Sequence, residues 1–157
     1  MIIEVSKDFI LEYPDSLEQA VLYLTDVKKS LAHVSFIENL RLEQNHIFAD
    51  LVVDVPVLGS QCLDFDSILE PHATGANLVA QKREGRAWAA VSGQGRAVQT
   101  NNQTQIHYAL QIAVYLELPS TDKWGGRAFE KMAQATAKTA IERLTREFGH
   151  GVSQGMS

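Results

Sequence analysis

The sequence predicts an α+β fold in which a curved antiparallel sheet of about seven strands is covered by one long C-terminal helix. Between Phe129 and Phe148, apolar residues recur every three or four positions, which is the spacing of one face of an α-helix. From Phe36 to Leu118, apolar residues instead alternate with polar ones, as they do in strands that bury one face. The connections between these segments are short, so consecutive strands are expected to pair as antiparallel hairpins.

The N-terminal part of the chain predicts one strand followed by two short helices. The strand is expected over residues 2–11. A Tyr-Pro-Asp-Ser stretch at residues 13–16 ends it, because proline restricts the residue before it and Asp or Ser can cap a helix. The first helix carries an apolar stripe from Leu17 to Leu24, and a second helical turn is expected to cover Leu31 and Val34.

Six further strands are expected before the last helix. They span residues 36–42, 47–55, 61–67, 76–82, 86–98 and 105–118. The last of them has the most regular alternation and is long enough to curve around a helix. Pro119 ends this strand, and the closing helix is expected over residues 124–148.

The composition fits one domain, expected over residues 1–148 and followed by a disordered Gly- and Ser-rich tail at residues 149–157. A net charge of −5 argues against binding to nucleic acid or to an anionic membrane surface, since clustered Lys and Arg drive such binding. No stretch approaches the ~18 consecutive apolar residues of a membrane span. The N-terminus also lacks the features of a signal peptide, so a cytoplasmic protein is expected.

No signature of a metal site, a cofactor site or a catalytic triad accompanies this pattern. The five histidines show no HxxxH or HExxH pairing, whereas a zinc site needs three or four convergent ligands. Cys62 is the single cysteine and is interpreted as a buried structural thiol. The Gly-Gln-Gly stretch at residues 93–95 has no helix after it and predicts a bulge or sharp bend in a strand. The glycine pair at residues 125–126 predicts close packing of the helix start against the sheet.

Several charged groups are interpreted as surface groups. Paired carboxylates on one strand face perform acid–base chemistry when burial raises one pKa. The paired aspartates here are expected to point outwards; they are Asp50, Asp54, Asp64 and Asp66. By parity, His107 also points away from the apolar face of its strand. The basic residues of segment 82–86 predict a solvated turn.

The order of these elements resembles the START-like, or helix-grip, superfamily (SRPBCC). This superfamily includes polyketide cyclases, birch-pollen-allergen-like proteins and proteins of the carbon-monoxide-dehydrogenase type. The segments at residues 55–59 (VPVLG), 75–78 (GANL) and 123–132 (KWGGRAFEKM) are also similar to those of a small bacterial family of unknown function within it. The resemblance implies that the sheet curls around the long helix and leaves a pocket between them. Members bind lipids, sterols, polyketides or other apolar molecules, and a minority catalyse cyclisation or hydration.

The implied pocket leads to a set of candidate lining residues. They are Phe65, Trp88, Tyr108, Ile112, Phe129, Met132 and Thr136. Apolar residues at these spacings are also typical of a core, and the hydroxyls of Tyr108 and Thr136 would be the polar handles of a pocket. The predicted function is non-catalytic binding or carriage of a small hydrophobic ligand such as a lipid, without a cofactor. Two alternatives stay open: a cyclase- or hydratase-type enzyme with Tyr108, His107 or an aspartate as acid–base group, and a protein-interaction module, with a homodimer as one form.

Overall fold

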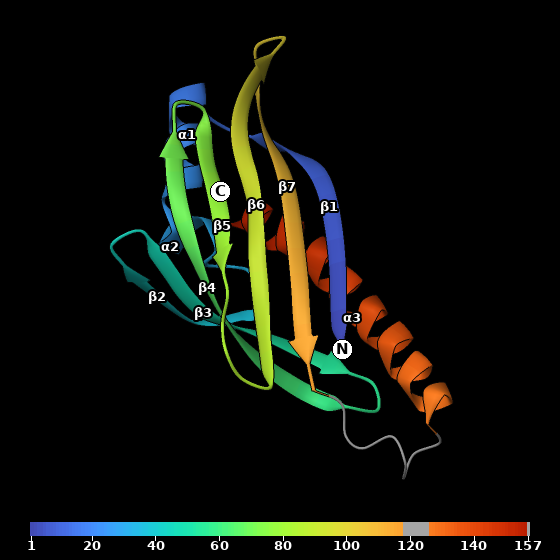
Figure 1. Cartoon of the computed structure of the whole chain (residues 1–157). Coiled ribbons are helices and arrows are strands. Elements are labelled where there is room, and N and C mark those ends of the chain that lie inside the picture. Colours follow the sequence, from blue (N-terminus) through green and yellow to red (C-terminus); the bar gives the residue numbers. More distant parts are fainter. Residues whose placement is uncertain (118–125, 157) are drawn as a thin grey trace.

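The computed structural model describes residues 1–117 and 126–156. Its seven strands form one sheet in the spatial order β1-β7-β6-β5-β4-β3-β2, and neighbouring strands run antiparallel (Figure 1). The strands are β1 (Ile2–Tyr13), β2 (Ile37–Glu43), β3 (His46–Val55), β4 (Gly59–His72), β5 (Gly75–Gln81), β6 (Ala87–Thr100) and β7 (Gln103–Leu116). The predicted α+β fold is confirmed: a curved seven-stranded antiparallel sheet, two short helices after the first strand and a long C-terminal helix.

The two short helices are α1 (Leu17–Thr25) and α2 (Val27–Ser30). Ser16 caps α1 by accepting a hydrogen bond from the backbone N–H of Gln19 at 3.2 Å. Asp26 caps α2 in the same way through the N–H of Lys29, also at 3.2 Å. Each cap satisfies a backbone donor that has no partner inside its helix, so the predicted capping residues explain where both helices begin.

The hairpin between β6 and β7 turns at Asn101 and Asn102, as predicted. Both residues have positive φ, 50° and 67°, which suits a two-residue hairpin loop. The connection between β4 and β5 is tighter than the loop expected at residues 71–75. Only Ala73 and Thr74 form the turn, because Pro71 and the residue after it still belong to β4.

The long helix α3 (Arg127–Gln154) crosses one face of the sheet diagonally and contacts β1, β3 and β7 (Figure 1). Its apolar stripe packs with the inward-facing residues of the sheet in a single core. The buried side chains of this stripe include Phe129, Ala133, Ala137, Ala140, Ile141, Leu144 and Phe148. The spacing read from the sequence therefore identified the buried face of the helix.

The chain after Phe148 corrects one prediction, because it is helical rather than disordered. α3 continues without a break, and Val152 in its last turns is fully buried. Tyr23 of α1 donates a hydrogen bond from its hydroxyl to the carbonyl oxygen of Val152 at 2.7 Å. A Cβ on Gly151 would lie 2.6 Å from the carbonyl oxygen of His33. The glycines that suggested a flexible tail instead let the helix end approach another backbone closely.

The start of α3 also differs from the prediction in the role of its glycine. Gly126 has a φ of 62°, and a Cβ built on it would meet no atom within 4 Å. Glycine therefore suits this position because of its left-handed backbone, and not because the helix packs closely here. The expected strand end at residues 118–119, the expected helix start at Trp124 and the role of Gly125 lie outside the described residues.

Candidate functional site

A cavity of about 80 Å³ lies between the short helices and the sheet. Leu24 and Val27 cover one side, while residues 76–78 of β5, 92–95 of β6 and 108–110 of β7 form the other. At ~30 Å³ per water molecule, the space holds roughly two or three waters. Pockets for drug-sized ligands typically span about 300–1,000 Å³. In this conformation the cavity therefore accommodates a small group of atoms, and it lies beside the C-terminal part of α3 rather than under its first half.

The cavity exists partly because β6 lacks side chains at two positions. A Cβ on Gly95 would lie 2.7 Å from Cδ2 of Leu24 and 3.2 Å from Cε1 of Tyr108. A Cβ on Gly93 would collide with the carbonyl oxygen of Ala109. The register between β6 and β7 runs without a shift through both glycines, so the bulge considered for this stretch is not present. The glycines leave room for α1 and β7 to approach β6.

An aromatic cluster forms one wall of the site. Tyr108 of β7 stacks on Phe9 of β1, with ring centroids 5.1 Å apart, and meets Phe148 of α3 edge-on at 5.7 Å. Phe9 also contacts Phe148 edge-on at 5.9 Å. Such offset and edge-to-face pairs stabilise ring packing beyond area burial. The cluster therefore fixes the position of the Tyr108 ring beside the cavity.

The lining of the cavity carries no charged side chain, since it contains no Asp, Glu, Lys, Arg or His. Tyr108 is its titratable group with a shifted pKa. Burial, and to a smaller degree the neighbouring Tyr23, raises the pKa of Tyr108 above its usual value of 10.0. The hydroxyl therefore stays protonated at neutral pH and can donate or accept a hydrogen bond. Asn77 supplies an amide, and its Oδ1 atom is buried without a hydrogen-bond partner among the described residues.

Of the seven predicted lining residues, Tyr108 alone belongs to the lining of this cavity. Phe65 and Ile112 are core residues, only 2% and 1% exposed. Phe129 is buried near the start of α3, whereas Met132 is 47% exposed.

The two remaining candidates make other contacts. The Thr136 hydroxyl donates a hydrogen bond to the carbonyl oxygen of Met132 at 3.0 Å, within its own helix. Trp88 is the register partner of Tyr115 and stacks on it with ring centroids 3.9 Å apart. By strand parity this pair lies on the face of the sheet opposite α3, because the flanking residues Ala89 and Val114 belong to the core.

The structure adds lining residues that the sequence did not indicate. They include Leu24, Val27, Asn77, Leu78, Gly93, Gly95 and Phe148. The Gly-Gln-Gly stretch was the available signal, since glycine inside a strand marks a place where another chain segment approaches closely. The approach of α1 to β5 and β6 is a long-range contact that no local pattern reports.

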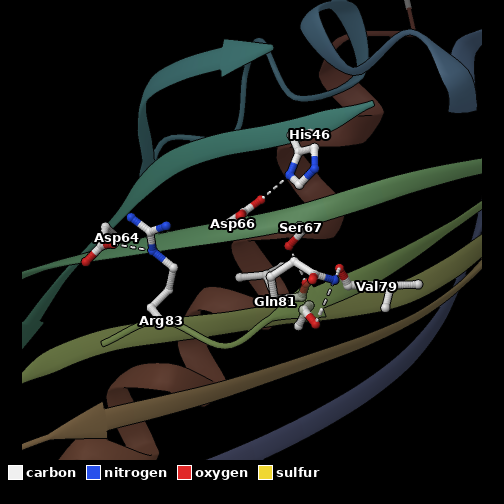
Figure 2. A network of polar contacts seen from close by, with 9 residues as sticks. His46, Asp64, Asp66, Ser67, Val79, Gln81 and Arg83 are labelled. Atoms are coloured by element: carbon white, nitrogen blue, oxygen red, sulfur yellow. Dashed lines mark hydrogen bonds and ion pairs between the residues drawn. The ribbon is translucent and has the colours of Figure 1, made fainter. Parts of the chain in front are cut away.

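A polar network occupies the other face of the sheet (Figure 2). Asp66 of β4 contacts Nδ1 of His46 of β3 through Oδ1 at 3.0 Å, and the His46 ring stacks on Phe48. Asp66 was expected to be a solvated carboxylate, but the residue is only 8% exposed. Figure 2 shows Ser67 pointing to the opposite side of β4, where its hydroxyl donates to the carbonyl oxygen of Val91 at 2.6 Å. This network ties strands together and lies away from the cavity.

The basic segment between β5 and β6 is largely paired with carboxylates. Nε of Arg83 contacts Oδ2 of Asp64 at 2.7 Å (Figure 2), and Nε of Arg86 lies 3.4 Å from Oε2 of Glu117 at an exposed position. Exposed ion pairs of this kind contribute little to stability. Asp64 is therefore part of a surface ion pair, and the segment does not form an isolated cationic patch.

Other predicted surface groups follow strand parity. Asp54 is exposed, and Oδ2 of Asp50 accepts a hydrogen bond from Nδ2 of Asn39 at 2.8 Å. His107 is half-buried outside the cavity, with Nε2 3.2 Å from Oε1 of Gln105. Cys62 corrects another prediction, because it is an exposed free cysteine and not a buried thiol. Its position on β4 alternates with the buried Leu63 and therefore faces outwards.

Two searches of residues 1–117 and 126–156 found nothing further. No group of three or more His, Cys, Asp or Glu residues there is arranged to hold a metal ion. No helix of this part is both long and apolar enough to cross a membrane. The site therefore consists of the apolar cavity, the Tyr108 hydroxyl and a few neutral polar groups.

The arrangement of a curved antiparallel sheet, two short helices after β1 and a long C-terminal helix is that of the START-like helix-grip proteins. Within this class, the chain belongs to the family described as "Protein of unknown function (DUF3809)", whose family model matches residues 8–146. No curated protein matches the chain in sequence.

Solved structures share the fold at low sequence identity. The ZhuI aromatase/cyclase from Streptomyces sp. R1128 is 14% identical with a TM-score of 0.62, over 98% of this chain and 93% of that one. A START superfamily protein from Mycobacterium smegmatis is 16% identical with a TM-score of 0.56, over 96% and 97% of the two chains. TTHA0849 from Thermus thermophilus is 13% identical with a TM-score of 0.55, over the full length of both. These similarities identify the fold and leave the function to be argued from the site.

Proposed function

We propose that this chain is a non-catalytic binding or carrier protein for a small, uncharged, hydrophobic ligand, held in the cavity among α1, α2, β5, β6, β7 and the end of α3. The observation that carries the proposal is an apolar cavity whose lining contains no charged residue. An ionised ligand would lose its hydration there without gaining an opposite charge, which costs several kcal/mol. A neutral apolar ligand gains free energy from burial instead. The cytoplasm as its location and a homodimer stay predictions of the sequence.

The composition of the site favours binding over catalysis. Cyclisation and hydration need a group that exchanges protons near neutral pH, and a good acid–base catalyst has a pKa close to the working pH. Tyr108 is the candidate that lines the cavity, and burial moves its pKa further from neutrality. His107 and Asp66, the other kinds of group considered, do not line the cavity. The hydroxyl of Tyr108 suits the positioning of a ligand better than proton transfer.

A ligand of ordinary size requires the cavity to widen. The short helices are the element best placed to move, because α1 packs against β5 and β6 across the cavity. The Tyr23–Val152 hydrogen bond holds α1 to the end of α3 in this conformation. Binding a larger ligand therefore selects a state in which α1 and α2 lie further from the sheet.

Native mass spectrometry of the protein purified without organic solvent tests the proposal directly, since a carried molecule adds a discrete mass. A parallel titration uses N-phenyl-1-naphthylamine, a neutral dye whose fluorescence rises in apolar surroundings. A cavity-filling variant, Ala76→Val, adds methyl groups opposite Gly95 and is expected to weaken dye binding. Ala113→Val makes the same change on the outer face of β7 and serves as the matched control.

The expected result is a bound mass or saturable dye binding that Ala76→Val weakens and Ala113→Val leaves unchanged. The absence of any adduct, together with dye binding that is equal in all three proteins, contradicts the proposal. A catalytic role gains support instead if the bound molecule is chemically altered by the wild-type protein but not by Tyr108→Phe.

A further inference from the structure

One buried polar atom near the cavity lacks a partner. The Oδ1 atom of Asn77 is buried, and no described residue donates a hydrogen bond to it. Asn77 is also one of the residues that line the cavity. Buried carbonyl oxygens in folded proteins are nearly always hydrogen-bonded, because leaving one unpaired costs free energy. The atom therefore points to a donor that the chain itself does not supply.

The position of Asn77 explains why no neighbour satisfies it. β5 pairs with β6 only from Gly75 to Leu78, and the register ends one residue after the Asn77–Gln94 pair. The partner of Leu78 on β6 is Gly93, which has no side chain. Around Asn77 the sheet therefore changes from paired strands to open space, and the adjoining cavity surface is mostly apolar.

We propose that the ligand carries a neutral hydrogen-bond donor, a hydroxyl or an uncharged N–H, attached to an apolar body, and that this donor binds Oδ1 of Asn77. The inference rests on the proposed ligand-binding function. An ammonium donor is excluded because no carboxylate lines the cavity to compensate a buried positive charge. An apolar molecule without a donor would fill the space but leave the oxygen unpaired. The competing occupant of the site is an ordered water molecule.

Two isomers of equal composition separate these cases. n-Butanol has a hydroxyl donor, whereas methyl n-propyl ether has the same atoms and an acceptor but no donor. Both are small enough to be tried in a cavity of about 80 Å³. Their dissociation constants are measured on the wild-type protein by NMR, from the shifts of the methyl signals of Leu24, Leu78 and Leu110. The alcohol is expected to bind about two- to tenfold more tightly, the usual contribution of one neutral hydrogen bond.

The variant Asn77→Leu removes the oxygen and keeps a side chain of similar size. It is expected to abolish the preference for the alcohol while the ether still binds. Gln111→Leu replaces another amide with leucine on the exposed outer side of β7 and is expected to keep the preference. If Asn77→Leu does not fold, the comparison of the two isomers on the wild-type protein still decides the question.

Each outcome has a defined meaning. If neither isomer shifts the three methyl signals, both the inference and the cavity as a binding site are contradicted. If both bind equally, or the ether binds more tightly, the donor inference is wrong and the proposed binding function stands. A crystal structure of the alcohol complex that keeps a water molecule on Oδ1 of Asn77 also overturns the inference.

Discussion

The hydrogen bond between Tyr23 and Val152 is the contact through which α1 holds the end of α3 in place. The Tyr23 hydroxyl donates to the Val152 carbonyl at 2.7 Å, and both residues are almost completely buried. The carbonyl belongs to the last turn of α3, where backbone oxygens have no partner inside the helix. Tyr23→Phe removes the donor and leaves the oxygen buried. We expect the free energy of unfolding to fall by about 1–2 kcal/mol.

The size of this loss predicts a measurable change in thermal stability. For a domain of this length, 1 kcal/mol corresponds to roughly 2–4 °C in Tm, so the variant should melt about 2–8 °C earlier. Urea denaturation followed by circular dichroism gives the free energy itself. Tyr115→Phe is the matched control, because its ring stacks on Trp88 on the outer face of the sheet. This control should stay within about 0.5 kcal/mol of the wild type.

The pH dependence provides a second and independent test. Burial, followed by Tyr13 and Asp26, raises the pKa of Tyr23 from 10.0 to about 12. Between these values the native state keeps a proton that the unfolded chain has lost, so the stability from Tyr23 falls as pH rises. It is fully present below pH 10 and lost as pH passes about 12. The stability difference between wild type and Tyr23→Phe should therefore be constant below pH 10 and shrink above it.

Two results would refute this reasoning. One is a loss of stability in Tyr115→Phe equal to that in Tyr23→Phe, which would mean that any lost tyrosine hydroxyl has the same effect. The other is a difference between wild type and Tyr23→Phe that does not change between pH 10 and about 12. In that case Tyr23 would have the same pKa in the native and unfolded states.

Three further changes test other parts of the structure. Gly151→Ala places a Cβ 2.6 Å from the carbonyl oxygen of His33 and should cost about 1–3 kcal/mol in urea denaturation; an unchanged protein would show that the close approach is absent. Phe148→Ala removes a buried ring from the aromatic cluster and should cost about 3–5 kcal/mol while enlarging the cavity, so N-phenyl-1-naphthylamine should bind more tightly if the protein folds. Cys62 is exposed, but burial and nearby carboxylates raise its pKa, so a maleimide should label the native protein more slowly than a cysteine peptide; Asp50→Asn should speed the labelling, and an equal rate would contradict the effect of Asp50.

The fold could be predicted because the information that specifies it is local. Strand alternation sets which residues face inwards, and the helix spacing of α3 sets its buried stripe. Both patterns are read within one segment, so they need no knowledge of its neighbours. The same local reasoning failed after Phe148, where glycine suggested a flexible tail. At Gly151 glycine is required by the backbone of another segment, which a local pattern does not reveal.

The site was less predictable because it depends on contacts between distant segments. Tyr108 was identified from its place on an apolar strand face, but the cavity owes its shape to missing side chains at Gly93 and Gly95 and to α1 across from them. Asp66 is a similar case. Its partner His46 lies 20 residues away, and the β3–β4 register brings the two side chains together.

The short pairing between β5 and β6 divides the sheet into two panels, one formed by β2 to β5 and the other by β6, β7 and β1. Past Leu78, the rest of β5 is joined to β4 alone, apart from the bridge that links β4 directly to β6 near Trp88. Hydrogen–deuterium exchange should therefore be fastest, within the sheet, at the amides along this seam. Slight hinging of the panels would alter the volume beneath the short helices without melting either half.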